Sequence, residues 1–211
     1  DEADAQLLLV LGEDRVVRRE LLQHDVLDLQ AAALNALDDI LRRGLFVLTN
    51  RVLRLIELAL GLPELELISK HNKSKSTTTR ILHYPKWNDS IQENQMRGGE
   101  HTDYGTVTIL FTDENPGLQI KPRNTNEWID APYIPNTCIV NVGDLLQRWT
   151  NDCYVSTPHR VVNTNLNTSR YSFAHFVHPC DDVQVDSLVG EQKYKTIGAK
   201  EYLVWRLNQS Y

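Results

Sequence analysis

The chain has 211 residues, enough for one sizeable core and short for two comfortable domains. Its 22 basic and 28 acidic residues give a net charge of −6, which disfavours a nucleic-acid partner, because phosphate binding needs a basic surface. No apolar run in the sequence approaches the roughly 18 residues of a membrane helix, so a membrane is not an expected partner either.

The N-terminal part is expected to be mainly helical. Leu and Ala dominate Val26–Arg43, and Gly44 stands where a helix C-cap would stand. The short apolar run Leu45–Thr49 is predicted to be a strand. A second helix is predicted over Arg51–Leu60, ended by the Gly-Leu-Pro segment that follows it.

From Thr77 onward, short β-rich runs alternate with turn residues. The predicted strands lie near Thr77–Tyr84, Thr106–Phe111, Leu118–Lys121, Thr137–Val142, Val155–Val162 and Arg170–Val177. A short helix is predicted over Gly143–Arg148 and a C-terminal helix over about Ala199–Leu207. The chain is therefore expected to be mainly β with flanking helices, folded as a double-stranded β-helix, or jelly-roll, barrel.

The three cysteines, Cys138, Cys153 and Cys180, are odd in number and lack C-x-x-C spacing. This pattern disfavours both a zinc site and a disulfide framework. It indicates a reducing compartment, and we expect a cytoplasmic protein. The sequence leaves the oligomeric state open.

A metal site is predicted around the segment Gly-Glu-His-Thr-Asp-Tyr-Gly. In an extended chain, residues two apart point to the same side, so the side chains of His101 and Asp103 can reach one ion. His159 is the candidate third ligand. Two imidazoles and one carboxylate, with the opposite face open, form the facial triad of Fe(II) oxygenases, and the open positions admit a co-substrate and O₂. The alternative is a chance pair and a histidine that is hydrogen-bonded in the core.

A co-substrate anchor is predicted on the last long strand. Arg170, Ser172, Ala174 and Phe176 share one face of that strand. An arginine that faces a barrel interior needs an anion there, and a dicarboxylate such as 2-oxoglutarate would supply it. The alternative is a surface arginine paired with an acidic side chain.

The strand near Thr77–Tyr84 offers further candidates, since Arg80, Leu82 and Tyr84 also share a face. Tyr84 could hydrogen-bond the co-substrate, and Arg80 would be a second cation in the same cavity. An edge strand with Arg80 in solvent explains the pattern equally well.

Taken together, these motifs resemble those of the 2-oxoglutarate and Fe(II)-dependent dioxygenases related to isopenicillin N synthase. The segments that carry the resemblance are HTDYG, VNVGDLLQRWTND, STPHRVV, RYS, RILHYP and the ending KEYLVWRLNQSY. Within these enzymes the chain is most similar to a group that includes fungal thymine 7-hydroxylase and ethylene-forming enzyme.

The resemblance covers roughly residues 51–211 and implies roles for nine residues. It implies that iron is bound by His101, Asp103 and His159, and 2-oxoglutarate by Arg170, Ser172 and Tyr84. Substrate would contact Arg80, Tyr104 and Phe176. No catalytic residue is implied beyond the metal centre.

The chain departs from the resemblance at two places. Leu82 stands where many relatives carry Asn, which predicts fewer hydrogen bonds to the co-substrate. After Asn50 the relatives normally have a long stretch before the helix that Arg51 begins. We therefore expect a shortened N-terminal region over residues 1–50 and an oxygenase jelly-roll domain over residues 51–211.

The expected activity is oxidation of a small organic molecule, with 2-oxoglutarate and O₂ consumed and succinate and CO₂ released. Two aromatic rings and a cation would suit a planar, pyrimidine-like substrate. Two alternatives stay open: an Fe(II) oxidase that uses no 2-oxoglutarate, in which the Arg–Ser pair holds the substrate's own carboxylate, and a non-catalytic binding protein.

Overall fold

The computed structural model describes residues 22–86, 96–164 and 167–210. The chain separates into two compact units, residues 1–48 and 49–211. The elements in chain order are α1 Leu22–Leu60, η1 Ile68–Lys70, β1 Thr78–Tyr84, β2 Gly98–His101, β3 Val107–Thr112, β4 Leu118–Ile120, β5 Ile129–Asp130, β6 Ile139–Val142, α2 Asp144–Trp149, β7 His159–Val161, β8 Arg170–Val177, β9 Gln184–Val185, β10 Ile197–Gly198 and α3 Ala199–Ser210.

One continuous helix, α1, occupies Leu22–Leu60, so the predicted C-cap at Gly44 and the predicted strand over Leu45–Thr49 are wrong. A helix interior tolerates an isolated glycine at a cost of about 1 kcal/mol relative to alanine, and no proline interrupts the segment. The helix ends where predicted, because Gly61 adopts a φ of +67°. Within the described part of the chain, no helix is long and apolar enough to cross a membrane.

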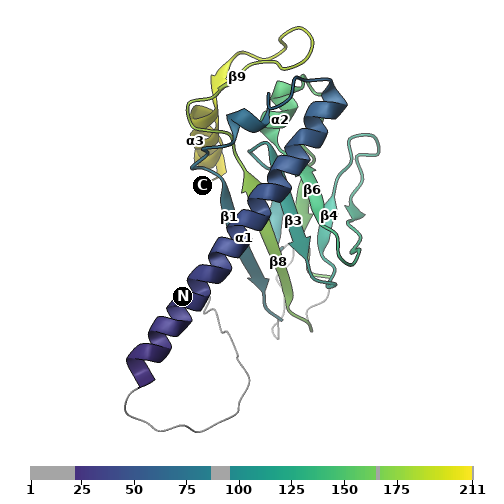
Figure 1. Cartoon of the computed structure of the whole chain (residues 1–211). Helices are drawn as coiled ribbons and strands as arrows, with labels where there is room; N and C mark the ends of the chain where they lie inside the picture. The colour runs from purple at the N-terminus through teal and green to yellow at the C-terminus, as the bar shows by residue number, and fades with distance from the viewer. Residues whose placement is uncertain (1–21, 87–95, 165–166, 211) are drawn as a thin grey trace. The chain divides into compact units, whose positions relative to one another are not determined.

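Two four-stranded sheets form the jelly roll, which confirms the predicted fold. The first has the strand order β1-β8-β3-β6 and the second the order β2-β7-β4-β5. Every pairing in both sheets is antiparallel. A separate two-stranded sheet joins β9 and β10. Figure 1 shows β1, β8 and β3 side by side, with α2 and α3 near one end of the barrel.

The strand predictions hold for β1, β3, β4, β6 and β8, each within about two residues. The strand predicted over Val155–Val162 is shorter and covers only His159–Val161, consistent with the missing N–H of Pro158. The strand Gly98–His101 was not predicted, because two glycines and a glutamate have low β propensity.

The core of residues 49–211 is formed by the last turns of α1, the segment at η1, the helices α2 and α3, and residues of β3, β8 and β9. Its buried members are Leu53, Leu67, Ile68, Val107, Leu145, Leu146, Trp149, Val177, Val185, Ala199 and Tyr202. Glu57, fully buried, accepts hydrogen bonds from the backbone N–H groups of Leu67 at 2.8 Å and Ile68 at 3.0 Å. The shared core, which contains side chains of α2, α3 and Val107 of β3, fixes the two helices beside the loop that precedes β3.

Candidate active site

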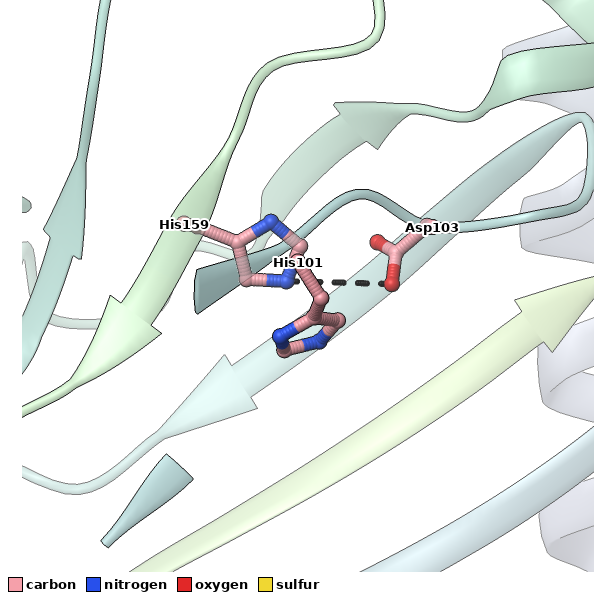
Figure 2. Close-up of side chains that lie close together, drawn as sticks. All are labelled: His101, Asp103 and His159. Carbon is pink, nitrogen blue, oxygen red and sulfur yellow. Dashed lines mark ion pairs between the residues drawn. The ribbon is translucent and has the colours of Figure 1, made fainter. Parts of the chain in front are cut away.

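The three predicted metal ligands lie together in the structure (Figure 2). His101 ends β2 and His159 begins β7, and the two residues are paired in the ladder between these strands. Asp103 follows two residues later in the loop before β3. One ligand atom from each residue lies within 4.8 Å of the others, and His159 Nε2 lies 3.7 Å from Asp103 Oδ1. The three side chains could therefore hold one ion.

The backbone orients both imidazoles. His101 Nδ1 lies 2.8 Å from the carbonyl oxygen of Gly99, and His159 Nδ1 lies 3.1 Å from that of Thr157. A carbonyl oxygen only accepts, so each Nδ1 carries the proton and each Nε2 offers a lone pair to a metal. Fixing the tautomer of a ligand histidine in this way is the usual role of its outer hydrogen bond.

Asp103 is also held by a partner that the sequence analysis did not single out. Asn141 Nδ2 on β6 donates a hydrogen bond of 2.6 Å to Asp103 Oδ2. This bond leaves Oδ1 as the oxygen that faces His159. Asn141 belongs to the quoted segment VNVGD, but only the strand pairing reveals which ligand it contacts.

Two glycines bring the metal loop against α2. The N–H of Asp144 donates to the carbonyl of Asp103 at 2.8 Å, and the N–H of Leu145 to that of Gly105 at 3.0 Å. A Cβ at Gly143 would lie 2.2 Å from the oxygen of Gly105, and a Cβ at Gly105 would lie 2.4 Å from the oxygen of Val177. Because neither position has room for a side chain, the glycines of HTDYG and NVGD fix the loop that carries Asp103.

The metal triad opens into a cavity of about 520 Å³ between the two sheets. The inward faces of β1 and β8 line this cavity, and the residues predicted on those faces are all present. Its lining includes Arg80, Leu82, Tyr84, Arg170, Ser172, Ala174 and Phe176, together with His101, Asp103 and His159. His83 and His175 do not line this cavity: His83 stacks on Tyr171, and His175 hydrogen-bonds Thr79.

Arg170 is the charged group of this cavity that most clearly needs a ligand. Its side chain is buried, with 2% exposed, and burial lowers its pKa. Among the described residues, neither Nε nor Nη1 has a hydrogen-bond partner. The guanidinium carbon lies 5.2 Å from the centre of the Tyr84 ring, and buried Ser172 lines the same cavity. A buried guanidinium with unused N–H groups fits the carboxylate of a 2-oxoacid.

A second cavity, of about 360 Å³, adjoins the triad. It is lined by the three predicted substrate residues, Arg80, Tyr104 and Phe176, and by His101 and Asp103. The guanidinium of Arg80 lies 5.9 Å from the centre of the Phe176 ring. All nine residues singled out in the sequence therefore line one or both of these cavities.

The barrel strands lie in a segment that matches a known protein family. Residues 76–179, which begin two residues before β1 and end two residues after β8, match the model of the 2OG-Fe(II) oxygenase superfamily. The chain carries a domain of this superfamily. The resemblance read from the sequence is thereby confirmed.

Similar proteins agree with this assignment. The oxygenase domain is similar to the 2-oxoglutarate-dependent dioxygenase htyE of Aspergillus rugulosus, with 40% identity over 65% of this chain and 44% of that protein. The structure resembles the crystal structure of a full-length Neurospora crassa protein in complex with alpha-KG, with a TM-score of 0.77, 36% identity and coverage of 84% of this chain and 57% of that one.

A second structure of the same Neurospora protein, in complex with alpha-KG and thymine, matches with a TM-score of 0.72 and 38% identity over 79% of this chain and 54% of that one. The chain spans about half the length of the curated relatives that it matches.

Proposed function

We propose that the protein is an Fe(II)- and 2-oxoglutarate-dependent oxygenase, and that His101, Asp103 and His159 hold the iron. The observation that carries the proposal is one cavity that contains both the three-ligand site and the buried Arg170. Two nitrogens of Arg170 have no hydrogen-bond partner among the residues that the structure describes. Bound Fe(II) would supply the activation of O₂. One oxygen atom would enter succinate as 2-oxoglutarate loses CO₂, and the other would enter the substrate.

The protein's own residues would bind and orient the co-substrate. Arg170 would form a charge-assisted hydrogen bond with the carboxylate remote from the metal, and Ser172 and Tyr84 would add hydroxyl donors. Leu82 contributes only apolar contact at a position facing the same cavity. Asn141, by holding Asp103 Oδ2, would keep the carboxylate turned toward the ion.

The substrate is proposed to be a small, planar, pyrimidine-like molecule. Arg80 would donate hydrogen bonds to its carbonyl oxygens, while Tyr104 and Phe176 supply aromatic contact surface beside the triad. The similarity to a Neurospora protein whose structure contains thymine supports this substrate class.

The extent and location of the domain are also proposals. We propose that residues 51–211 form the oxygenase domain. Leu53, near its beginning, and Tyr202, near its end, belong to one core, which supports these bounds. The three cysteines are unpaired, which supports a reducing compartment, and we propose the cytoplasm. Cell fractionation tests the location.

The test of the activity is to measure succinate, O₂ uptake and oxidised product together with a panel of pyrimidines. We expect succinate to form only with Fe(II), 2-oxoglutarate and O₂ all present, and the Asp103→Ala variant to form none. Oxidised product without succinate would instead support an oxidase that does not use 2-oxoglutarate. Iron binding without turnover of any substrate would support a binding protein.

A further inference from the structure

The C-terminal helix contacts the metal loop through one arginine. Arg206 Nη2 on α3 donates a hydrogen bond of 2.9 Å to Thr102 Oγ1, the side chain between His101 and Asp103 in sequence. Its guanidinium carbon also lies 4.6 Å from the centre of the Tyr104 ring. A single side chain therefore contacts the residues on both sides of Asp103.

The same arginine is anchored on α2. Arg206 Nε lies 3.1 Å from Asp144 Oδ2, and Tyr202, one turn earlier on α3, donates its hydroxyl to that oxygen at 3.1 Å. The backbone N–H of Asp144 in turn donates to the carbonyl of Asp103. The Arg206 side chain is 25% exposed and that of Asp144 is 13% exposed, so water screens this ion pair less than one on the surface.

These contacts hold the metal loop from two directions. The α2 backbone binds the carbonyl of Asp103, while Arg206 binds the side chain of Thr102 and covers the ring of Tyr104. Because these contacts are made to the neighbours of Asp103 in the loop, Arg206 would act on an ion through the loop. A loop fixed on both sides loses less conformational freedom when an ion binds.

We propose that Arg206 is a positioning residue for the iron centre, which makes metal affinity depend on the docking of α3. This inference rests on the proposed metal site. Because coupling between binding equilibria is reciprocal, Fe(II) binding stabilises the docked α3 as much as the docked α3 strengthens Fe(II) binding. Leu203 and Leu207 of the same helix line the smaller cavity, so α3 joins the substrate wall to the metal loop.

The test is the dissociation constant of Fe(II), measured anaerobically by competition with a chromogenic chelator, in the full-length protein and in its variants. Arg206→Leu should weaken Fe(II) binding about 10-fold. This is the lower end of the effect of removing a direct hydrogen-bond partner of a metal ligand, because Arg206 acts on Asp103 only through the loop. Arg206→Lys should recover part of the affinity, because an ammonium can pair with Asp144 but lacks the planar fork that also reaches Thr102.

Thr102→Val removes the other end of the hydrogen bond with little change of shape. It should weaken Fe(II) binding less than Arg206→Leu, and the double variant should be less impaired than the product of the two single effects. Lys200→Leu is the matched control, since Lys200 is a cation of the same helix that pairs with Asp181 instead. Its Fe(II) affinity should stay within about twofold of the parent.

Thermal unfolding of the metal-free variants separates positioning from simple stability. If Arg206→Leu lowers the melting temperature while the folded protein binds Fe(II) as tightly as the parent, Arg206 has a structural role only and the inference is wrong. Equal weakening by Lys200→Leu would also overturn it. A folded parent protein that does not bind Fe(II) would overturn the proposed metal site itself, and this inference with it.

Discussion

Replacing Arg170 by leucine should separate a ligand-binding arginine from a structural one. Arg170 is 2% exposed and two of its guanidinium nitrogens lack hydrogen-bond partners among the described residues, so a bound carboxylate would be a close anionic partner. Truncating one member of a buried charge pair costs about 2–5 kcal/mol. We therefore expect the dissociation constant of 2-oxoglutarate to rise about 30- to 5,000-fold.

The same substitution should have little effect on the stability of the ligand-free protein. It removes a cation–π contact with Tyr84, worth about 0.5–1 kcal/mol, together with a hydrogen bond to Tyr84 and an attraction to Asp113. These losses are offset because the substitution also removes a buried cation whose Nε and Nη1 have no hydrogen-bond partner among the described residues. The free energy of unfolding should therefore change by no more than about 1 kcal/mol. Arg170→Lys should recover only part of the 2-oxoglutarate affinity, since it lacks the planar fork.

The assay combines urea unfolding of the metal-free protein with an anaerobic titration of 2-oxoglutarate in the presence of Fe(II). Arg123→Leu, at an exposed position in the loop between β4 and β5, is the control and should change neither quantity. An unchanged titration in Arg170→Leu, together with a loss of more than about 2 kcal/mol of stability, would assign Arg170 to the scaffold and not to the co-substrate site.

Three further predictions follow from the site and its surroundings. Alanine at any of the three triad positions should abolish Fe(II) binding in an anaerobic titration, and undiminished affinity would refute the assignment. Gly105→Ala places a Cβ 2.4 Å from the oxygen of Val177, so it should cost about 2 kcal/mol or more in thermal unfolding and weaken metal binding; a neutral substitution would contradict the close packing. Burial lowers the pKa of His71 to about 4, so as the pH falls the unfolded chain takes up a proton at His71 before the folded protein does. The stability that depends on neutral His71 is therefore intact above pH 6.5 and is lost as the pH falls toward 4, by up to about 1.4 kcal/mol per pH unit. Urea unfolding between pH 7 and 4.5 should show a flatter profile for His71→Gln, and identical profiles would contradict this.

The site was predictable from the sequence where local geometry decides the outcome. Residues an even number apart on a strand face the same way, which placed Arg170 with Ser172 and Arg80 with Tyr84. The pairing of His101 with His159 could be inferred only from ligand chemistry, because the two residues meet across different strands.

The rest depended on contacts between distant segments. Asn141 reaches Asp103, and Arg206 reaches Thr102, only once the sheets and α3 are in place, so no local pattern marks these partners. Gly44 was misread for the opposite reason: a local stop signal was outweighed by the continuous helix around it.

Joint binding of Fe(II) and 2-oxoglutarate in the cavity is tested most directly by the absorbance of the Fe(II)–2-oxoglutarate charge-transfer complex in an anaerobic titration. We predict that the band appears only when the parent protein, Fe(II) and 2-oxoglutarate are all present. It should be absent in Asp103→Ala and require far more 2-oxoglutarate in Arg170→Leu. A folded parent protein that binds Fe(II) yet develops no such band at saturating 2-oxoglutarate would show that the cavity does not hold 2-oxoglutarate at the metal.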